Sequence, residues 1–299
     1  MDTVSAETTC FRHPKRETFV RCSRCDRYIC SDCMRDAPVG QRCPECVKDE
    51  NRNVRRARTV FGGHTITTAW VTYVIIALNV AAYLVELVSP GVIDRFDGLG
   101  SGLLGPDGQY YVDDGGSFAG YQMVGVLHGE WWRLITSNFL HSEPGTSGFG
   151  LTHIVFNMLW VFSLGRFLEE KLGRLRFLAL YLLAGVGGSV LEVVLSPDTG
   201  AIGASGAVFG LAAAYFVLTR KLHEHPMDRN RMMIYLLIWL VASAGFASWQ
   251  GHLGGLLTGG VAAIGLAYAP RKHRDVVHAV VLAGVAVFLV LVVLVKAVQ

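Results

Sequence analysis

Two side chains that could together carry out acyl transfer stand at the openings of two apolar stretches. Ser205 lies in a Gly-Ala-Ser-Gly run at 203–206, and His252 is followed by Leu-Gly-Gly at 253–255. Polar side chains are costly within a membrane segment, so each of them calls for an explanation. A serine becomes a nucleophile when an imidazole within hydrogen-bond reach, roughly 2.6–3.2 Å, accepts its proton. The pattern predicts Ser205 as the nucleophile and His252 as its general base.

Small residues in both stretches would bring the two helices close enough for such a bond. Each stretch holds two glycines four residues apart, a spacing that lets membrane helices approach closely. In helices, Ser205 would share a face with Phe209, and His252 would share one with its glycines. The alternative is a packing seam whose serine bonds to its own backbone, but a histidine on a glycine-lined face favours the catalytic interpretation. The glycine pairs are Gly206 with Gly210 and Gly255 with Gly259.

A further pair of polar side chains could stabilise the negative charge that acyl transfer creates. His153 and Asn157 are four residues apart, so they share a helix face. The oxyanion formed by serine attack needs preorganised N–H donors. An imidazole N–H, a carboxamide N–H and the backbone N–H of Ser205 would supply them. Alone, the pair would more often be a polar contact between helices; beside Ser205 and His252 it predicts an oxyanion hole.

All 7 cysteines of the chain lie between Cys10 and Cys46. With one histidine they form four pairs, each with two residues between its members, and this gap lets a turn present both side chains to one tetrahedral ion. Eight ligands suffice for two closed zinc sites, and the short intervals between pairs leave the folding energy to the metal. We expect two structural zinc ions and no chemistry in this head. The pairs are Cys10 with His13, Cys22 with Cys25, Cys30 with Cys33, and Cys43 with Cys46.

Disulfides or redox-active thiols are the alternatives for the head. The first thirty residues show no apolar signal-peptide region, so we expect the head to stay in the reducing cytosol, where disulfides are rare. A redox-active pair usually sits in a strand–helix unit that this head lacks. The ligand pattern resembles a B-box zinc finger, although the B-box usually ends in histidines. The resemblance implies a cross-brace, with Cys10, His13, Cys30 and Cys33 on one ion and Cys22, Cys25, Cys43 and Cys46 on the other.

The chain as a whole has the composition of a helical membrane protein. Of its 299 residues, 52% are hydrophobic and 17% are charged, and a net charge of +3 is too small to indicate nucleic acid. Apolar stretches follow one another, several of them near the ~20 residues that a helix needs to cross a bilayer. We therefore predict an all-α membrane bundle with seven crossings. The stretches lie near 68–88, 150–168, 175–195, 202–219, 232–248, 251–269 and 277–297.

Basic residues predict the orientation of these crossings, because cytoplasmic connections are enriched in lysine and arginine. Every second connection is basic, while the alternate ones contain only Arg95 and Arg133. This pattern predicts a cytoplasmic N-terminus, a C-terminus outside, and Ser205 and His252 near the outer face. The basic connections are at 51–67, 166–176, 220–231 and 271–274, and the alternate ones at 89–149, 196–201 and 249–250.

The first outer connection is long, and its two parts differ. Residues 98–120 are rich in glycine and aspartate, so we expect them to be irregular. Residues 123–141 mix Trp131, Trp132 and Phe139 with polar side chains, a pattern typical of segments that lie in the membrane interface.

From about 68 to 270 the chain resembles the rhomboid family of intramembrane serine proteases, whose core has six helices. Several short motifs carry the resemblance, and together they are very specific. The stretch near 277–297 would be the extra helix of the six-plus-one members. The motifs are Gly-Glu-Trp-Trp-Arg at 129–133, His153-x-x-x-Asn157, Gly-Arg-Phe-Leu-Glu-Glu-Lys-Leu-Gly at 165–173, Gly-Ala-Ser-Gly at 203–206, and His252 followed by Gly255-x-x-x-Gly259.

The resemblance implies roles for individual residues. The helix of Ser205 would be short and would start below the membrane surface, at the bottom of a water-filled cavity. The family's catalytic dyad, oxyanion hole and imidazole-packing aromatic residue correspond in turn to Ser205 and His252, to His153, Asn157 and the Ser205 amide, and to Phe209.

Other positions match the family without implying chemistry, and one segment departs from it. Trp131 and Arg133 match a structural loop motif, although Arg133 could also be an ordinary interfacial cation. Glu169 matches a position that ties the second and third membrane helices together. Residues 142–152 are an insertion beside the active-site mouth that could alter substrate entry.

These inferences predict an intramembrane serine endopeptidase that cleaves transmembrane-helix substrates near the outer membrane face through a Ser–His dyad. No acidic third member is apparent, since Glu86 and Glu192 have no assignable partner. A catalytically inactive rhomboid-like protein that binds membrane clients is the alternative, although Gly203 and the dyad, which such relatives lose, are present here. A transporter fits poorly, because no broken inverted repeat is visible and charges inside the helices are few.

The expected domains are a B-box-like zinc domain at 1–50, a basic linker at 51–67, the protease core at 68–270 and the additional helix in 271–299. The expected partners are single-pass transmembrane substrates, membrane lipid and a protein bound through the zinc domain, with no nucleic acid. Catalysis itself needs no cofactor. The expected location is a bacterial plasma membrane, which the chain crosses several times.

Overall fold

The computed structural model describes residues 8–53, 57–89, 91–113, 116, 119–143, 150–224, 228–242 and 248–299. The chain forms two compact units, Met1–Ala57 and Arg58–Gln299. The predicted head at 1–50 lies in the first unit, and the predicted linker at 51–67 contributes to both. The two units are considered separately below.

The first unit has very little apolar core. Its buried apolar cluster consists of six cysteines and Ile29, with Phe11 and Met34 packed against them. Two short antiparallel ladders and one helix hold the cysteines in place, and Pro44 opens that helix at a position where its missing N–H costs nothing. The elements are β1 (Thr9–Cys10), β2 (His13–Glu17), the 3-10 turn η1 (Ser31–Cys33), β3 (Arg35–Asp36), β4 (Gln41–Arg42) and α1 (Pro44–Asn53).

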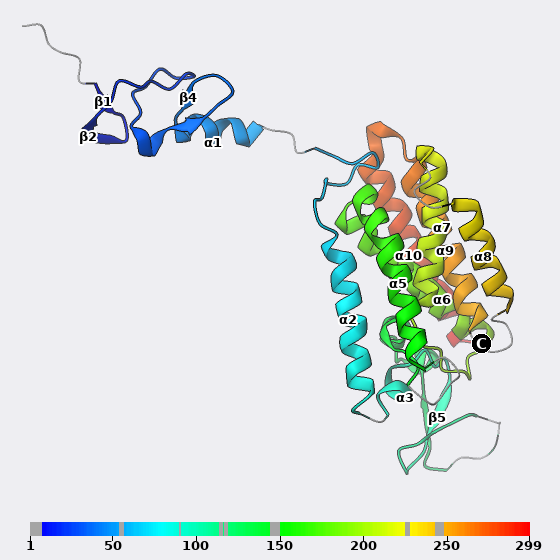
Figure 1. Ribbon diagram of the computed structural model, residues 1–299. Helices are drawn as coiled ribbons and strands as arrows, with labels where there is room; N and C mark the ends of the chain where they lie inside the picture. Colours follow the sequence, from blue (N-terminus) through cyan, green and yellow to red (C-terminus); the bar gives the residue numbers. More distant parts are fainter. Residues whose placement is uncertain are drawn as a thin grey trace, which may run out of the picture. The chain divides into compact units, whose positions relative to one another are not determined.

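The second unit is a helical bundle (Figure 1), and each predicted apolar stretch overlaps one of its long helices. The fourth stretch begins its helix at Ser205 itself, three residues later than predicted. The fifth helix ends at Ala242, and residues 243–247 lie outside the described part of the chain. The long helices are α2 (Trp70–Glu86), α5 (Gly150–Leu172), α6 (Arg174–Leu195), α7 (Ser205–Leu222), α8 (Arg229–Ala242), α9 (Trp249–Tyr268) and α10 (Arg274–Ala297).

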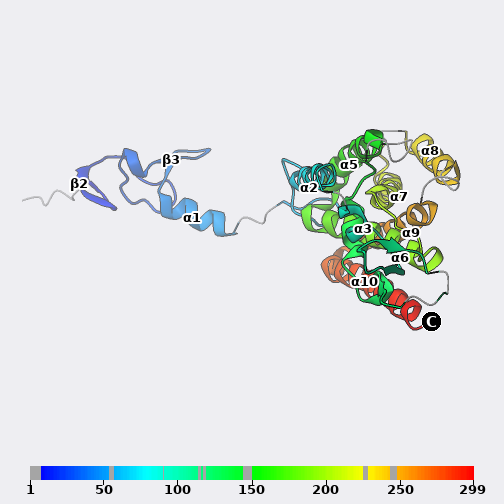
Figure 2. The ribbon, with the colours of Figure 1, turned by 90° about the horizontal axis from the view of Figure 1, so that it is seen from below.

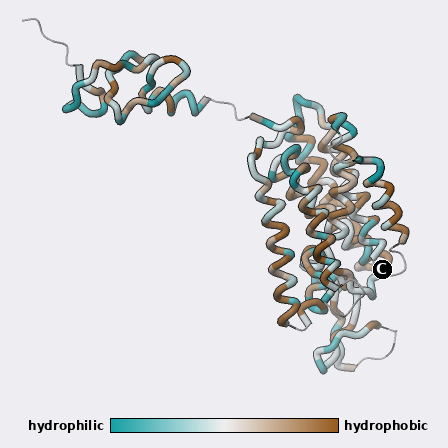
Figure 3. Tube along the Cα trace, viewed as in Figure 1, coloured by the Kyte–Doolittle hydropathy of each residue, from teal (hydrophilic) through white to brown (hydrophobic). Residues whose placement is uncertain are grey.

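The bundle has the length and surface of a membrane protein. Among the described residues, 4 helical spans are long and apolar enough to cross a bilayer: Gly150–Leu172, Arg174–Leu195, Trp249–Tyr268 and Arg271–Ala297. Two shorter apolar helices, Trp70–Glu86 and Asn230–Ala242, accompany them. Hydrophobic residues cover the length of α2 in Figure 3. The protein is therefore an all-α membrane protein, in which outward-facing apolar side chains meet lipid.

Helix α7 lies at the centre of the bundle, enclosed by α5, α6, α8 and α9 (Figure 2). Small side chains make this position available: Ala212 and Ala214 are fully buried, and α7 packs most extensively against α6 and α9. The residue that opens α7 is consequently surrounded by the rest of the bundle. This arrangement places Ser205 inside the protein.

Glu169 ties together a different pair of helices from the predicted one. Its carboxylate accepts hydrogen bonds from the Val71 N–H (3.1 Å) and from the N–H and hydroxyl of Thr72 (both 2.8 Å). These groups belong to the first turn of α2, where a negative charge is favoured by the helix dipole. The third membrane helix contributes only Arg174 Nε at 3.9 Å. The predicted link between the second and third helices is thus mainly a link between the first and second.

The additional helix α10 is attached at its N-terminal end. Asp275 accepts from Arg176 Nη2 (2.6 Å) at the start of α6 and from Arg58 Nη1 (2.7 Å) in the preceding linker. Arg176 Nε also lies 2.7 Å from His278 Nδ1. These polar contacts lie at the end of the bundle opposite Ser205, and the buried Leu289 and Val293 of the extra helix add apolar packing with the core.

The early part of the outer connection, predicted to be irregular, contains two short strands, β5 (Gly102–Leu104) and β6 (Tyr110–Tyr111). With β7 (Gln122–Val124) they form a small antiparallel sheet in the order β6-β5-β7. The turn between the first two strands uses Asp107, whose carboxylate accepts the Gln109 N–H at 3.1 Å. Glycine and aspartate here mark a tight turn, which their frequency in turns explains.

Arg133 occupies the interior of this outer region. It is fully buried, and its guanidinium donates to Glu130 Oε2 (2.6 Å), to Asp97 Oδ1 (2.6 Å) and to the Asp94 carbonyl (2.8 Å). These contacts join α3 (Val92–Phe96) to α4 (Arg133–Thr136). A buried, paired arginine of this kind has a structural role, so the interfacial-cation alternative does not describe Arg133.

Candidate active site

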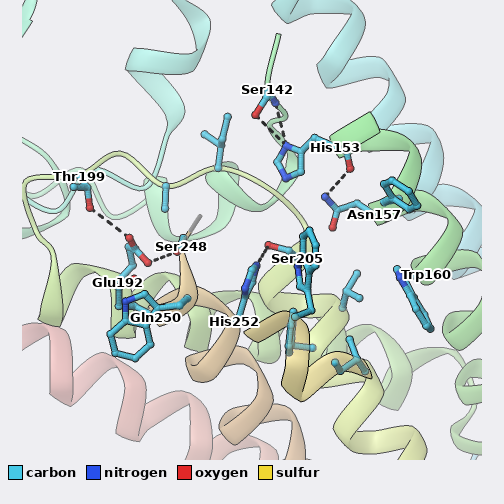
Figure 4. A pocket seen from close by; sticks show the side chains of 18 of the residues that line it. Ser142, His153, Asn157, Trp160, Glu192, Thr199, Ser205, Ser248, Gln250 and His252 are labelled. Atoms are coloured by element: carbon cyan, nitrogen blue, oxygen red, sulfur yellow. Dashed lines mark hydrogen bonds between the residues drawn. The ribbon is translucent and has the colours of Figure 1, made fainter. Parts of the chain in front are cut away.

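Ser205 is the first residue of α7 and His252 lies in the first turn of α9, and their side chains are in contact. The Ser205 Oγ lies 3.0 Å from His252 Nε2, a hydrogen-bonding distance, and His252 is buried. Figure 4 shows the two side chains pointing toward each other from α7 and α9. The contact joins residues 47 positions apart in the sequence. The geometry is that of a serine whose proton an imidazole can accept.

The predicted glycine seam allows this contact. A Cβ on Gly206 would lie 3.1 Å from the Gly251 carbonyl oxygen, and one on Gly210 would lie 2.8 Å from that of Gly255. In the opposite direction, a Cβ on Gly255 would overlap the Gly206 carbonyl, and one on Gly259 would overlap Gly210. The two backbones are therefore in direct contact, and no larger residue fits without separating the helices.

Phe209 holds the imidazole of His252 in one orientation. Its ring stacks on the imidazole with centroids 4.5 Å apart and an interplanar angle of 14°. Phe209 is one helical turn after Ser205, so the same face of α7 presents both the hydroxyl and the packing surface. The contact agrees with the role that the rhomboid resemblance implies for Phe209.

A glycine in an unusual conformation opens the approach to Ser205. Gly203 has φ = +123°, a conformation that side chains disfavour, and its N–H donates to the Ser137 carbonyl at 2.9 Å. A Cβ at Gly203 would lie 2.8 Å from His153 Nε2 and 3.8 Å from Ser205 Oγ. Glycine therefore keeps open the space between the predicted nucleophile and the predicted oxyanion donor.

The hydrogen bonds of His153 indicate which nitrogen carries its proton. The backbone N–H of Ser142 donates to His153 Nδ1 at 3.2 Å, and the Ser142 hydroxyl lies 3.3 Å from the same atom. A backbone N–H can only donate, so Nδ1 is an acceptor and the proton of the neutral ring is on Nε2. His153 consequently directs an N–H donor toward Gly203 and Ser205.

Asn157 lies on the same face of α5 as His153. One hydrogen of its amide nitrogen is engaged by the His153 carbonyl at 3.0 Å, which fixes the amide. A carboxamide nitrogen has two hydrogens, so the second can serve a ligand. His153 and Asn157 therefore lie together, as the four-residue spacing predicts.

These side chains all line one cavity of about 790 Å³ within the bundle. Aromatic residues from α5, α8 and α9 contribute to its wall, and a water-sized or larger ligand has room beside Ser205. The four predicted site side chains and the main aromatic residues are Ser205, His252, His153 and Asn157, with Trp160, Tyr235, Trp239 and Trp249.

Glu192, which had no assignable partner from the sequence, caps the helix of His252. Its carboxylate accepts from the Gly251 N–H at 3.1 Å and from the Ser248 hydroxyl, while the Thr199 hydroxyl donates to its other oxygen at 3.4 Å. Ser248 is itself the N-cap of α9. A carboxylate at a helix N-terminus is stabilised by the dipole and by free N–H groups. In the sequence, Ser248 directly before α9 is the residue that could have indicated this cap.

Separately, the head brings together the two predicted sets of metal ligands. One set is Cys10, His13, Cys30 and Cys33 and the other is Cys22, Cys25, Cys43 and Cys46, with the ligand atoms of each set within 4.8 Å of one another. The pairs thus join as a cross-brace, as the B-box resemblance implies.

The spacing of these ligand atoms suits a tetrahedral ion. Zinc–sulfur bonds of about 2.3 Å place two sulfurs roughly 3.8 Å apart. The Cys25 and Cys43 sulfurs are 3.8 Å apart, and His13 Nδ1 lies 3.8, 3.2 and 3.4 Å from the sulfurs of Cys10, Cys30 and Cys33. All seven cysteines are free thiols, so no disulfide competes for them. Both clusters fit a zinc-sized ion.

The hydrogen-bonded pair of Ser205 and the buried His252 lies within a bundle of membrane helices. These features define the class of the protein, a helical membrane protein with a candidate hydrolytic site. Comparison with known proteins identifies the family. The rhomboid domain family model matches residues 128–269. The chain is 37% identical over 145 residues to the rhomboid-family protein YdcA of Bacillus subtilis (strain 168), covering 47% of this chain and 69% of that protein. The chain belongs to the rhomboid family.

Two further relatives are named as proteases. Rhomboid protease GluP of Bacillus subtilis (strain 168) is 38% identical over 171 residues, which are 54% of this chain and 32% of GluP. Rhomboid protease AarA of Providencia stuartii is 27% identical over 231 residues, which are 68% of this chain and 74% of AarA. The chain thus spans about a third of the length of GluP and about three quarters of that of AarA.

Proposed function

We propose that the protein is a serine endopeptidase that cleaves transmembrane segments within the membrane. The observation that carries the proposal is the 3.0 Å contact between Ser205 Oγ and His252 Nε2 inside a cavity of the helical bundle. The relatives named rhomboid protease support the same class of reaction. Trp160 from α5 and Trp239 from α8 line the cavity and suit an apolar substrate segment.

In the proposed reaction, Ser205 Oγ attacks the carbonyl carbon of a peptide bond as its proton passes to His252 Nε2. The resulting oxyanion accepts hydrogen bonds from the N–H groups of His153, Asn157 and the Ser205 backbone. When the tetrahedral intermediate collapses, the C–N bond breaks and His252 gives its proton to the leaving amine. Water then attacks the acyl-enzyme with His252 again as base, which releases the acid and restores Ser205.

Packing replaces an acidic third member in this scheme. Phe209 stacks on the imidazole, and the Glu192 carboxylate anchors the first turn of α9, so the ring is held without a carboxylate assigned to it. We also propose that Ser205 lies toward the outer face, since Lys171, Arg174 and Arg220 lie at the other end of α5, α6 and α7.

Labelling by a fluorophosphonate separates this function from that of an inactive client-binding relative. An activated serine attacks the phosphorus and displaces fluoride, so the purified protein in detergent will become labelled on the peptide that contains Ser205. Mass spectrometry of the digested protein locates the label. If the properly folded protein stays unlabelled while a known serine hydrolase in the same tube reacts, the inactive alternative replaces the proposal.

Adding one methyl group to the glycine seam will separate the catalytic pair. A Cβ on Gly255 overlaps the Gly206 carbonyl oxygen, so Gly255→Ala pushes α9 away from α7. A misplacement of about 1 Å can lower the rate about a hundredfold, and overpacking costs about 1–3 kcal/mol of stability. Cleavage rate and melting temperature will both fall. Gly260→Ala is the matched control, because its Cβ would lie 3.7 Å from that of Ala213 and should change neither quantity.

We propose that the two ligand clusters of the head each bind zinc and that these ions are structural. All four positions of each site are taken by protein ligands, which leaves no open position for a reactant. Cysteine thiolates with one imidazole are a donor set that zinc prefers. A protein partner for the head stays a prediction, and an effect of deleting residues 1–50 on co-purifying proteins would test it.

A further inference from the structure

One buried carboxylate in the first membrane helix is not used by the mechanism. Glu86 is the last residue of α2, and only 2% of its surface is exposed. A carboxyl group within a membrane bundle is costly unless a specific contact compensates for it. Among the described residues, Oε1 of Glu86 has no hydrogen-bond partner. Any role of this carboxylate therefore depends on the hydrogen bond that Oε2 accepts.

That contact reaches the segment that leads to the active site. Glu86 Oε2 accepts the backbone N–H of His141 at 3.1 Å, across 55 residues of sequence. His141 is completely buried, and its Nδ1 lies 3.2 Å from the Phe139 carbonyl. Its ring also meets Tyr83 of α2 edge-on, with centroids 6.5 Å apart. Helix α2 therefore holds the backbone at His141 in a single position.

The next residue along the chain contacts the predicted oxyanion donor. The backbone N–H of Ser142 donates to His153 Nδ1 at 3.2 Å, and the rings of His141 and His153 pack with centroids 5.1 Å apart. The peptide plane that carries the Ser142 N–H starts at the Cα of His141, so once His141 is held in place only the two backbone torsions of that residue set the direction of the Ser142 N–H. The Ser142 contact, in turn, is what keeps the proton of His153 on Nε2.

We propose that Glu86 is a positioning residue that sets the orientation and tautomer of His153 through the 141–142 backbone. The carboxylate acts as an acceptor for the His141 N–H, Ser142 then points its own N–H at His153 Nδ1, and His153 presents Nε2–H to the oxyanion. This inference rests on the proposed function, because it assigns Glu86 a part in stabilising that reaction's transition state. Glu86 touches neither substrate nor the reacting atoms.

The inference predicts which replacements of Glu86 preserve activity. Glu86→Gln keeps an oxygen that can accept the His141 N–H, so its kcat should stay within about threefold of wild type. Glu86→Leu has similar volume and no acceptor. Loss of a single oxyanion donor costs about 10²–10³-fold in kcat, so misaligning one should lower kcat by about 10–100-fold. KM should be unchanged, because the donor acts on the transition state.

A double-mutant cycle with His153 distinguishes positioning from general destabilisation. If Glu86 acts through His153, then Glu86→Leu lowers the activity of wild type but not that of His153→Ala, and the double variant equals His153→Ala alone. Asn79→Leu is the matched control. Asn79 lies two turns earlier on the buried face of α2 and bonds back to the Ile75 carbonyl at 2.8 Å, so its loss should affect stability and leave kcat unchanged.

The experiment measures cleavage of a single-pass reporter in proteoliposomes, and fluorophosphonate labelling rates replace it where cleavage is too slow. Equal losses from Glu86→Leu in the two backgrounds, no loss in wild type, or a Gln variant as poor as the Leu variant would each overturn the inference. Failure of the proposed function has a different signature, since wild-type protein would then neither cleave the reporter nor take up the label.

Discussion

Ser205→Ala will abolish cleavage of a transmembrane substrate and leave the protein folded. The Oγ atom forms the acyl bond, so its removal eliminates the covalent route, and loss of the nucleophile lowers kcat of a serine protease by about 10⁶-fold. The hydroxyl is hydrogen-bonded to His252 in the structure, and alanine fits in the place of Ser205 at the start of α7. The rate is measured on a single-pass reporter in proteoliposomes, beside the melting temperature of each variant.

A second serine in the bundle provides the matched control. Ser163 on α5 donates its hydroxyl to the Leu159 carbonyl at 2.7 Å, away from the cavity lining. Ser163→Ala removes the same atom from the same kind of helix and should cleave at the wild-type rate. Cleavage by Ser205→Ala within tenfold of wild type would falsify the assignment of the nucleophile.

Removing metal from the head will unfold the unit Met1–Ala57 while the helices of Arg58–Gln299 stay folded. Ile29 is the only non-cysteine in the buried core of the described part of the head, so little apolar burial remains without the ion. Structural zinc contributes an apparent free energy of about 10–16 kcal/mol in comparable small domains. Elemental analysis before chelation should give two zinc ions per chain. After chelation, a protease should digest the head first, and the helical circular dichroism of the bundle should persist.

Paired substitutions test how the ligands are shared. In the cross-brace, Cys10 and Cys30 belong to one cluster and Cys22 belongs to the other. The double variant Cys10→Ser/Cys30→Ser should therefore retain one zinc ion per chain, and Cys10→Ser/Cys22→Ser should retain none. The reverse result would show that neighbouring pairs share an ion, and the cross-brace would be wrong.

The dyad and its seam could be predicted because local spacing specifies them. Four-residue intervals put Gly206 and Gly210 on one helix face and Gly255 and Gly259 on another, whatever the rest of the chain does. Polar residues in apolar stretches are rare enough to be noticed individually, which singled out Ser205, His252, His153 and Asn157. In the head, the two-residue gap within each ligand pair made the eight metal ligands recognisable in the same way.

Other features depend on contacts between distant segments and could not be predicted. Glu86 meets the His141 N–H across 55 residues, and Glu192 meets Gly251 across 59. A backbone N–H carries no sequence signal, so neither of these two contacts could be predicted, although Ser248 marks the helix start at which Glu192 lies. Glu169 showed the same limitation, because its main partners on α2 are again backbone groups. In the outer loop, glycine and aspartate predict irregular structure, but Asp107 lies in the turn between two strands of a small sheet.

By itself, the sequence determined the chemical types available to this protein, namely a serine, an imidazole, two N–H donors and eight metal ligands at set intervals. It also determined the helices that carry them, because helical periodicity and apolar length are local properties. Only the tertiary structure decided that Ser205 opens the enclosed helix α7 and that its Oγ lies 3.0 Å from His252 Nε2. It also decided that the Ser142 N–H orients the His153 ring. These are distances between segments far apart in the chain, and packing alone sets them.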